Sequence, residues 1–262
     1  MAPATEITRA IPSTHGRLDR VRLTLEDALA TTIHVARFPR EAVRGMMVRF
    51  PRPRRVVDWC ARSGVRHAIV AGFFVRPEGR PLGELRLDGV PRDHEPFASP
   101  WGGRRGCVMV RDGRIEIASR TEFADSPPGD LLEVGPLLVR GGVSVVDGAR
   151  DPEGFSSTSH QFDSDITDGR YPRAALGVSE QDLFAVASDG RAPGEAGLTL
   201  AELANAMTML GSRTAINLDG GGSTSLVFDG VLRNAPREEH GLLIPGGRPV
   251  ATALAFDPTQ PT

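Results

Sequence analysis

Two aspartates in the second half of the chain follow short apolar runs and precede glycine. Asp219 comes after residues 215–218, and three glycines follow it directly. Asp189 comes after residues 183–187 and is followed by glycine and arginine. A carboxylate at the end of a buried strand is a candidate general base or nucleophile. We therefore take Asp219 and Asp189 as the candidate catalytic residues.

The glycine run after Asp219 suits the close approach of a ligand. Glycine has no side chain to keep a ligand away, and successive backbone N–H groups form anion-binding nests. We expect Gly220, Gly221 and Gly222 to donate N–H groups to an anion beside the carboxylate. Ser223 follows this run, Asn217 precedes Asp219 by two residues, and both are expected to bind the same ligand. The alternative is a glycine-rich turn that only leads into the next hairpin.

A helix is predicted between the two apolar runs. Thr199 and Glu202 form a capping-box pattern, in which each side chain bonds the backbone N–H of the other residue. Apolar residues follow at helical spacing, and Gly211 suits the position after the last turn. A strand, a helix and a strand of this size indicate a right-handed parallel crossover, with both carboxyl ends at one edge of the sheet. Asp189 and Asp219 are then expected within about two strand spacings of each other.

The composition excludes several classes of site. All 31 basic residues are arginine, which rules out a Schiff-base lysine, a pyridoxal-phosphate site and a Walker-A loop. The net charge of −2 gives no reason to expect a nucleic-acid partner, and no apolar run is long enough to span a membrane. The six histidines lack zinc-site spacing. The first residues lack the pattern of a secretory signal, so a cytoplasmic protein is expected, with Cys60 and Cys107 reduced and buried.

The longest irregular segment expected is 147–168, which is rich in Ser, Asp and Gly. A loop of this length in a compact domain is usually functional or mobile. His160 in this segment is a candidate substrate-binding or acid–base residue. Asp163, Asp165 and Asp168 offer oxygens to a divalent cation but lack the EF-hand spacing, and a solvated acidic loop is the alternative. No other cofactor is expected, and the metal requirement stays open.

The fold class expected is α+β, with mixed, hairpin-rich β-sheets, few helices and one strand-helix-strand crossover that carries the site. Asp112-Gly113 and Asp229-Gly230 each lie between two short apolar runs, which is the signature of a two-residue hairpin. One further helix is predicted at 54–63, because its apolar residues share one face.

Residues 1–65 are expected to form an Arg-rich N-terminal portion packed on the core. Residues 66–256 form the main domain, and residues 257–262 form a frayed tail. The arginines between positions 49 and 55 are expected to mark a solvated helix start rather than a nucleic-acid surface, because no aromatic residues alternate with them. The oligomeric state stays open.

The segment from Asn217 to Thr224, NLDGGGST, closely resembles the signature of the phosphodiester glycosidase family. The other matching stretches follow in the family's order: 72–74 (GFF), 81–83 (PLG), 134–139 (VGPLLV), 170–177 (RYPRAALG), 189–191 (DGR), 198–202 (LTLAE) and 248–254 (RPVATAL). The resemblance covers roughly residues 65–256. It implies an enzyme that hydrolyses the C1–O–phosphate bond of a sugar-1-phosphodiester, giving free sugar and a phosphorylated product.

Such a reaction passes through an oxocarbenium-like state and releases an anionic phosphate. Arg173 and Arg191 carry planar guanidinium groups suited to binding that phosphate. Asp219 or Asp189 then acts as the base for water or as the nucleophile. Glu202 is a third carboxylate, but its capping role is a sufficient explanation for it. The expected partner is a small sugar-phosphate molecule.

The sequence departs from the family's usual pattern at five positions. Val70 and Ala71 replace Asn and Gly, Ala174 and Thr252 replace Thr and Asn, and Gly247 replaces Glu. We expect these changes to remove polar groups near the pocket. Two alternatives to hydrolysis therefore stay open. One is transfer, elimination or rearrangement on a phosphorylated sugar or nucleoside in specialised-metabolite biosynthesis. The other is a non-catalytic carbohydrate- or phosphate-binding module.

Overall fold

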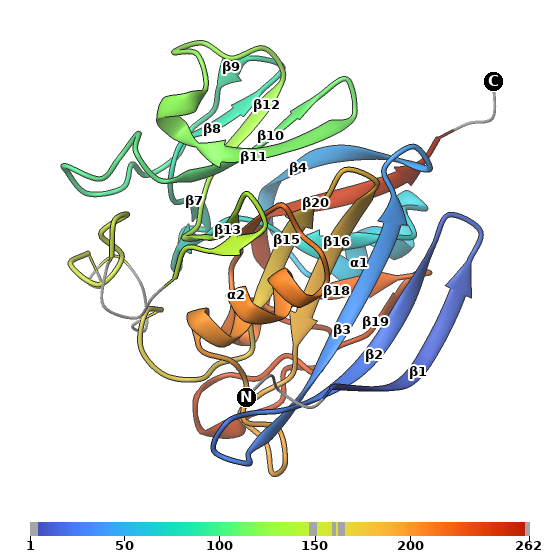
Figure 1. Cartoon of the computed structure of the whole chain (residues 1–262). Helices are drawn as coiled ribbons and strands as arrows, with labels where there is room; N and C mark the ends of the chain where they lie inside the picture. The colour runs from blue at the N-terminus through green and yellow to red at the C-terminus, as the bar shows by residue number, and fades with distance from the viewer. Residues whose placement is uncertain (1–4, 147–150, 159–160, 162–165, 260–262) are drawn as a thin grey trace.

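The computed structural model describes residues 5–146, 151–158, 161 and 166–259. In these residues the chain forms three large antiparallel sheets and two α-helices (Figure 1). The helices are α1 (Val56–Ser63) and α2 (Leu200–Met209). Short 3₁₀ turns occur at η1 (Arg120–Glu122), η3 (Gly221–Ser223) and η4 (Glu239–Gly241).

The largest sheet has eight strands in the described part of the chain. Their order across the sheet is β1 (Thr5–Ser13), β2 (Gly16–Thr24), β3 (Ala30–Pro39), β16 (Asp182–Ser188), β15 (Ala174–Val178), β17 (Thr214–Asn217), β13 (Leu137–Arg140) and β14 (Val143–Ser144). Each neighbouring pair is antiparallel.

Two further sheets have five strands each, and β6 (Phe74–Val75) pairs with β7 (Arg80–Pro81). One runs β11 (Arg114–Ser119), β10 (Gly106–Arg111), β12 (Asp130–Glu133), β8 (Leu85–Leu87) and β9 (Val90–Pro91). The other runs β19 (Val231–Leu232), β18 (Leu226–Phe228), β5 (Ala68–Val70), β20 (Val250–Pro258) and β4 (Val43–Arg54). The expected α+β class, with hairpin-rich sheets and few helices, is confirmed, but the strand pairs of these sheets are antiparallel rather than mixed.

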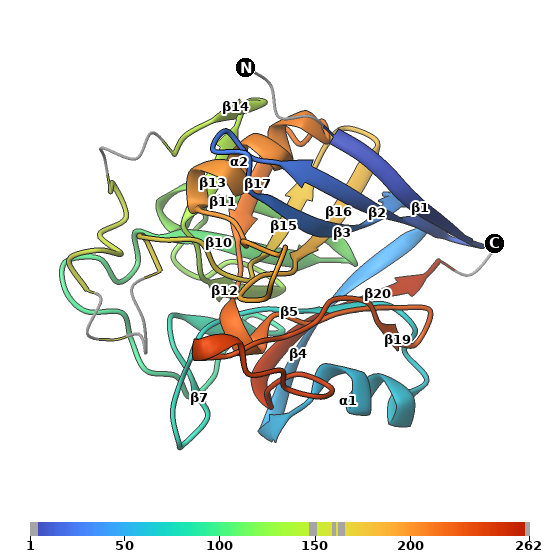
Figure 2. The ribbon, with the colours of Figure 1, turned by 90° about the horizontal axis from the view of Figure 1, so that it is seen from below.

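The largest sheet is covered on both faces. Buried residues of α2 pack with side chains from β3 and β16, such as Ile33 and Val186, on one face. The opposite face contributes Phe38 and Leu176 to the main core, which β4, β5 and β20 complete. Figure 2 shows the resulting layers, with α2 on the outer side of the large sheet and α1 beneath the sheet that contains β4 and β20.

The strands that end in the two candidate aspartates are separated by β15. Both β16 and β17 are antiparallel to β15, so they run parallel to each other but do not pair. The two strands that flank α2 are therefore not adjacent as expected, although their carboxyl ends lie at the same edge, two strand spacings apart. Neighbouring strands are about 4.8 Å apart, so the separation at this edge is about 10 Å. The sheet thus places the segments that follow β16 and β17 at the same end of the molecule.

Local turn and cap signals are confirmed. The hairpin turns at Asp112-Gly113 and Asp229-Gly230 have positive φ at both residues, as a type I′ turn requires. Thr199 accepts a hydrogen bond from the backbone N–H of Glu202, and the Glu202 carboxylate accepts one from Thr199 N–H. Gly211 adopts φ +90° after the last turn of α2. The helix predicted at 54–63 is α1, which ends at Gly64 with φ +79°.

The ends of the chain are more ordered than expected. The first 65 residues contribute β1 to β4 to two of the sheets, through the pairs of β3 with β16 and of β4 with β20. The arginines at 49, 52 and 54 lie on β4 rather than on a helix start. The last strand continues through Asp257 to Pro258, so these two residues of the predicted tail belong to a strand.

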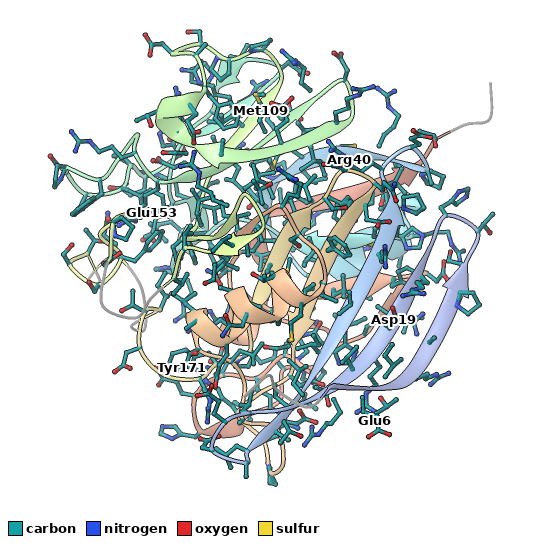
Figure 3. All side chains as sticks on the ribbon, in the orientation of Figure 1. Glu6, Asp19, Arg40, Met109, Glu153 and Tyr171 are labelled. Atoms are coloured by element: carbon teal, nitrogen blue, oxygen red, sulfur yellow. The ribbon has the colours of Figure 1, made fainter. Side chains whose placement is uncertain are left out.

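Arg105 anchors the irregular segment to the β-sheets. Its side chain is fully buried, and its guanidinium carbon lies 4.1 Å from the ring centroid of Phe97 and 3.8 Å from that of Phe155. Its nitrogens donate to the carbonyl oxygens of Glu153 and Gly154, at 2.9 and 3.0 Å. Figure 3 shows Glu153 beside this loop. A buried guanidinium that is bonded to these carbonyls and packed on two aromatic rings fixes residues 153–158 against the sheet.

Both cysteines are free and buried, as predicted. Burial raises the pKa of the Cys60 thiol to about 12 and that of Cys107 well above its ordinary value. Among the helices of the described residues, none has the length and apolar character needed to cross a membrane.

Candidate active site

A cavity of about 470 Å³ lies at the end of the large sheet where β16 and β17 finish. Figure 1 shows β16 running towards the lower end of the molecule, where Figure 3 marks Tyr171, one of the lining residues. The described lining comes from eight separate stretches of the chain: residues 73–76, 161, 166, 171–173, 191, 217–222, 238–239 and 248. The cavity therefore gathers segments that are far apart in the sequence around the Asp219 turn.

Asp219 is the predicted catalytic residue that the structure places in the cavity. Its backbone N–H donates to the carbonyl oxygen of Ala71 at 3.0 Å, which ties the turn to the residue that follows β5. Its Oδ1 accepts the N–H of Gly220 at 2.9 Å. These two bonds fix the position of the carboxylate at the cavity wall, as a general base or nucleophile requires.

The glycine run lines the cavity but does not form the expected nest. The N–H of Gly220 is directed to Asp219, and the N–H of Gly221 donates to the carbonyl oxygen of Pro172 at 2.8 Å. At most the N–H of Gly222 is left for an anion. The run instead allows close packing, because a Cβ on Gly220 would lie 2.9 Å from the Pro172 oxygen. The glycines shape the cavity, and other groups must bind the anion.

Asn217 lines the cavity, whereas Ser223 is buried and is not among the described lining residues. The Nδ2 of Asn217 donates to the carbonyl oxygen of Gly135 at 3.0 Å, so its Oδ1 faces away from that oxygen. That Oδ1 and the Ser223 hydroxyl are buried with no hydrogen-bond partner among the described residues. Buried polar atoms of this kind are commonly satisfied by ordered water.

Three arginines converge on Glu238 at the cavity. Nε and one terminal nitrogen of Arg248 donate to Oε1 of Glu238, at 3.0 and 2.7 Å. The hydrogen bond from Arg248 lowers the pKa of Glu238, burial opposes this, and the positive charges of Arg248, Arg76 and Arg191 lower it further. The described lining contains four arginines against three carboxylates, a surplus of one positive charge. That surplus matches a ligand with a single negative charge.

Arg191 remains a candidate for phosphate binding, as predicted. Its guanidinium carbon lies 4.8 Å from the ring centroid of Tyr171, and one nitrogen donates weakly to the carbonyl oxygen of Arg237 at 3.4 Å. A planar guanidinium held over an aromatic ring keeps in-plane N–H donors for a phosphate oxygen.

Arg173 also lines the cavity, but its guanidinium is committed to the protein. The side chain is buried, and its nitrogens donate to the carbonyl oxygens of Leu198, Ile166 and Gly169 at 2.9, 2.8 and 3.3 Å. These contacts hold the loop that carries Ile166 against the cavity. The prediction that the Arg173 guanidinium binds phosphate is therefore corrected: Arg173 positions this wall of the cavity.

Asp189 is not among the described residues that line the cavity. Its Oδ2 lies 2.9 Å from Nε2 of His34, and its Oδ1 accepts the N–H of Ala235 at 2.7 Å. Burial raises the pKa of Asp189, but the hydrogen bonds from His34 and Ala235 outweigh burial and bring the pKa below its ordinary value. Because Glu238 follows Ala235 by three residues, Asp189 holds the segment that completes the cavity, and the geometry gives it no direct contact with a substrate there.

The other acidic candidates have structural partners or lie outside the described residues. Glu202 caps α2 and also accepts two hydrogen bonds from Nε of Arg170 at 3.0 Å, so its structural role is confirmed. Asp168 is exposed and accepts the N–H of Gly169 at 2.9 Å. In the part of the chain that the structure describes, no group of three acidic, His or Cys side chains is arranged for a metal. His160, Asp163 and Asp165 lie outside the described residues.

Several lining residues were quoted in family motifs but were not predicted as site residues. They are Phe73, Phe74, Tyr171, Pro172, Leu218 and Arg248. The signal for them was the family resemblance of the stretches in which they lie. Arg76, Glu238 and Glu239 had no such signal, because only the folded chain brings them to Asp219.

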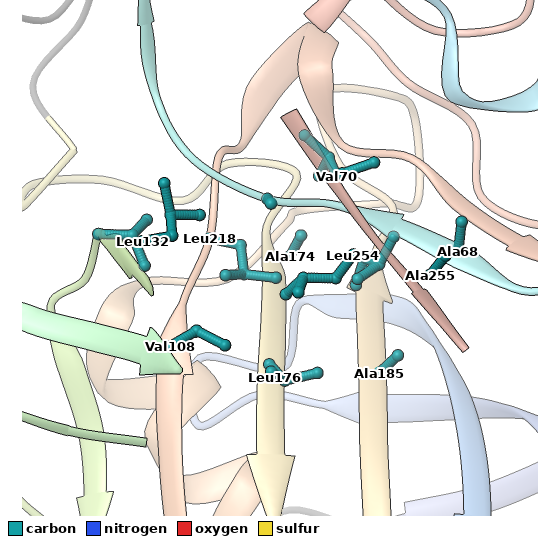
Figure 4. Packing of buried hydrophobic residues seen from close by; sticks show 14 of the residues in the cluster. Ala68, Val70, Val108, Leu132, Ala174, Leu176, Ala185, Leu218, Leu254 and Ala255 are labelled. Atoms are coloured by element: carbon teal, nitrogen blue, oxygen red, sulfur yellow. The ribbon is translucent and has the colours of Figure 1, made fainter. Parts of the chain in front are cut away.

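The side chains at four of the five positions that depart from the family's pattern are buried. Val70 and Ala174 are fully buried in the main core, and Figure 4 shows both among apolar side chains. Ala71 lies in the same core, and the hydroxyl of Thr252 accepts the N–H of Gly72 at 2.9 Å. At these four positions this chain thus has buried side chains that are not among the described lining residues of the cavity.

Comparison with known proteins agrees with the arrangement of these motifs. A family model described as phosphodiester glycosidase matches residues 63–257. The mouse protein N-acetylglucosamine-1-phosphodiester alpha-N-acetylglucosaminidase is 30% identical over 190 residues, which are 70% of this chain and 35% of the mouse protein. The chain thus spans about a third of the length of that curated relative.

Solved structures share the fold at low sequence identity. The zebrafish N-acetylglucosamine-1-phosphodiester alpha-N-acetylglucosaminidase catalytic domain, auto-inhibited by its pro-peptide, matches with a TM-score of 0.65 and 18% identity, over 98% of this chain and 88% of that chain. A hypothetical protein from Synechocystis matches with a TM-score of 0.62 and 16% identity, over 95% and 63% of the two chains. With a family model that covers most of its length and the signature glycine run in place beside Asp219, this chain belongs to the phosphodiester glycosidase family.

Proposed function

We propose that this protein hydrolyses the bond between C1 of a sugar and the phosphate oxygen of a sugar-1-phosphodiester. One observation carries the proposal: the Asp219 carboxylate and the arginine cluster of Arg76, Arg191 and Arg248 line the same cavity. A carboxylate beside convergent guanidinium groups supplies a base or nucleophile for the sugar and charge stabilisation for the phosphate.

The chemistry follows from the charges that develop. As the C1–O bond breaks, positive charge spreads over the sugar ring oxygen and C1, and the phosphate leaves with the bonding electrons. The arginines stabilise the departing phosphate without giving up a proton. Asp219 either takes a proton from water that attacks C1, or attacks C1 itself and is released by water in a second step. Both routes give free sugar and a phosphorylated alcohol, and they differ in the anomer of the sugar released.

The substrate proposed first is a phosphodiester of N-acetylglucosamine, because the mouse relative is named for that substrate. A role in specialised-metabolite biosynthesis is part of the same proposal. The binding-module alternative loses support, because Asp219 keeps its place at the cavity beside the arginines.

The proposal is tested by incubating the protein with α-N-acetylglucosamine 1-(methyl phosphate) and with analogues that carry other sugars. Mass spectrometry should detect free sugar and methyl phosphate in equal amounts, and proton NMR of the first product gives its anomeric configuration. A rearranged or transferred sugar would support the alternative chemistry. Saturable binding of every analogue without turnover would contradict an enzymatic role.

A further inference from the structure

A second hollow of about 480 Å³ adjoins the cavity that contains Asp219. Its lining consists of Tyr171, Arg191, Glu239, His240 and Gly241. The first three of these residues line both spaces. The guanidinium of Arg191 over the Tyr171 ring therefore stands at the boundary between the two spaces.

The turn that forms the second hollow is built tightly against Arg191. Gly241 has φ +77°, and a Cβ there would lie 2.6 Å from the carbonyl oxygen of Arg191. A side-chain nitrogen of Arg237 donates to the Gly241 carbonyl oxygen at 2.6 Å. The turn that carries Glu239 and His240 is thus held in place beside the arginine.

A phosphodiester has an organic group on each side of one negative charge. A site for it needs an anion-binding group with room on both sides, whereas a site for a phosphate monoester needs room on only one. Two adjoining spaces that meet at Arg191 provide this arrangement. With the sugar placed against Asp219 in the first cavity, the alcohol portion extends into the second hollow.

The charges of the second hollow limit what that alcohol can carry. Glu238 is neutralised by Arg248. Glu239 is exposed, and its carboxylate has no hydrogen bond or ion pair among the described residues. Once Arg191 binds the phosphate, the charge of Glu239 stays uncompensated and repels a second anionic group.

We propose that the second hollow binds the alcohol portion of the phosphodiester, and that Glu239 selects neutral, hydroxyl-bearing alcohols over phosphorylated ones such as nucleoside phosphates. This inference rests on the proposed function and names the substrate class on the leaving-group side. Glu239 touches the alcohol and not the reacting C1–O bond, so it determines specificity and is not a catalytic residue.

The test compares two substrates with the same sugar, α-N-acetylglucosamine 1-(methyl phosphate) and UDP-N-acetylglucosamine, on the wild type and on Glu239→Gln. Glutamine keeps the size of the side chain and removes its charge. The ratio of kcat/KM for the methyl diester to kcat/KM for the nucleotide sugar should fall about tenfold in the variant. The matched control is Glu116→Gln, an exposed glutamate on β11, for which the ratio should equal that of the wild type.

An unchanged ratio in Glu239→Gln, with the wild type active on the methyl diester, overturns the inference and leaves the proposed function standing. If the wild type turns over neither compound, the proposed hydrolysis fails. The inference is then decided by calorimetric affinities for the same two compounds, whose ratio should shift by the same factor. An equal preference for both compounds in the wild type, unaltered in the variant, also overturns it.

Discussion

The carboxylate of Asp189 and the imidazole of His34 form a buried pair, with 2.9 Å between Oδ2 and Nε2. The pair joins β3 to the end of β16, and the second oxygen of Asp189 holds Ala235. Replacing Asp189 with alanine leaves His34 and the Ala235 N–H without their acceptor. We predict that the free energy of unfolding falls by about 3 kcal/mol at pH 7, measured by urea denaturation.

This stabilisation should depend on pH in one direction. Because the folded protein lowers the pKa of Asp189, the stabilisation is complete at pH values above the ordinary carboxyl pKa and is lost as the pH falls through the lowered pKa. The difference between wild type and Asp189→Ala should therefore shrink as the pH is lowered from 7 towards 2.5. A difference that grows with acidification would show that the ionised form is not the stabilising one. Glu180→Gln, which alters an exposed ion pair with Arg213, serves as the control and should have little effect.

Gly154 has a steric reason to be glycine beyond its backbone conformation. Its φ is +66°, and a Cβ there would lie 2.0 Å from the indole of Trp101. Gly154→Ala should destabilise the protein by about 2–4 kcal/mol, since it adds a clash to the strain of a left-handed residue. Gly103→Ala is the matched control, because Gly103 has φ +75° with open space at its Cβ. Thermal denaturation of both variants separates the clash from the strain, and equal losses would contradict the packing at Trp101.

Both thiols should be unreactive in the folded protein. Cys60 and Cys107 are buried, and burial raises the pKa of both thiols, that of Cys60 to about 12. Thiolate is the reactive form, so a maleimide at pH 7.5 should label neither residue within minutes, and both after denaturation in guanidinium. Rapid labelling of either cysteine in the native protein, located by peptide mass spectrometry, would contradict this burial.

Turns and caps could be predicted from the sequence because each depends on a few adjacent residues. Two hairpin turns are fixed by residues with positive φ, Asp112-Gly113 and Asp229-Gly230. The start of α2 is fixed by the capping box of Thr199 and Glu202. Strand order depends on pairing across the whole chain, and nothing local indicated that β15 lies between β16 and β17. In β2, Arg20 and Arg22 alternate with buried Val21 and Leu23, which is a local strand signal in the sequence.

Residues of the candidate site could be predicted where a sequence motif follows the end of a strand. Asp219 and Arg191 line the cavity as expected. Residue type alone did not reveal what Arg173 and Asp189 bind. A guanidinium can donate to backbone carbonyls as well as to phosphate, and the Arg173 side chain donates to backbone carbonyls. A carboxylate can bind histidine as well as activate water, and Asp189 binds His34. Arg76 and Glu239 come from loops whose approach to Asp219 depends on the tertiary fold. A cytoplasmic location stays a prediction.

Arg191 should contribute mainly to binding and stabilising the phosphate. Arg191→Met keeps an unbranched side chain over Tyr171 and removes the hydrogen-bond donors. We predict a fall in kcat/KM of about 10–100-fold on a sugar-1-phosphodiester, the effect of losing one or two hydrogen bonds to a charged group. Arg213→Met is the control, because Arg213 is exposed and pairs with Glu180 outside the described lining. Steady-state kinetics showing no difference between the two variants would remove Arg191 from the phosphate site.

The most direct measurement compares Asp219→Asn with Asp168→Asn on α-N-acetylglucosamine 1-(methyl phosphate), by release of free sugar. Each aspartate accepts the N–H of the following glycine at 2.9 Å, and asparagine keeps that acceptor in both variants. Only Asp219 lies among the described lining residues, so kcat should fall by about 10²–10⁴-fold in Asp219→Asn and stay near the wild-type value in Asp168→Asn. The melting temperature of both variants should change little. Near-normal turnover by a stably folded Asp219→Asn would contradict the assignment of Asp219 as the base or nucleophile.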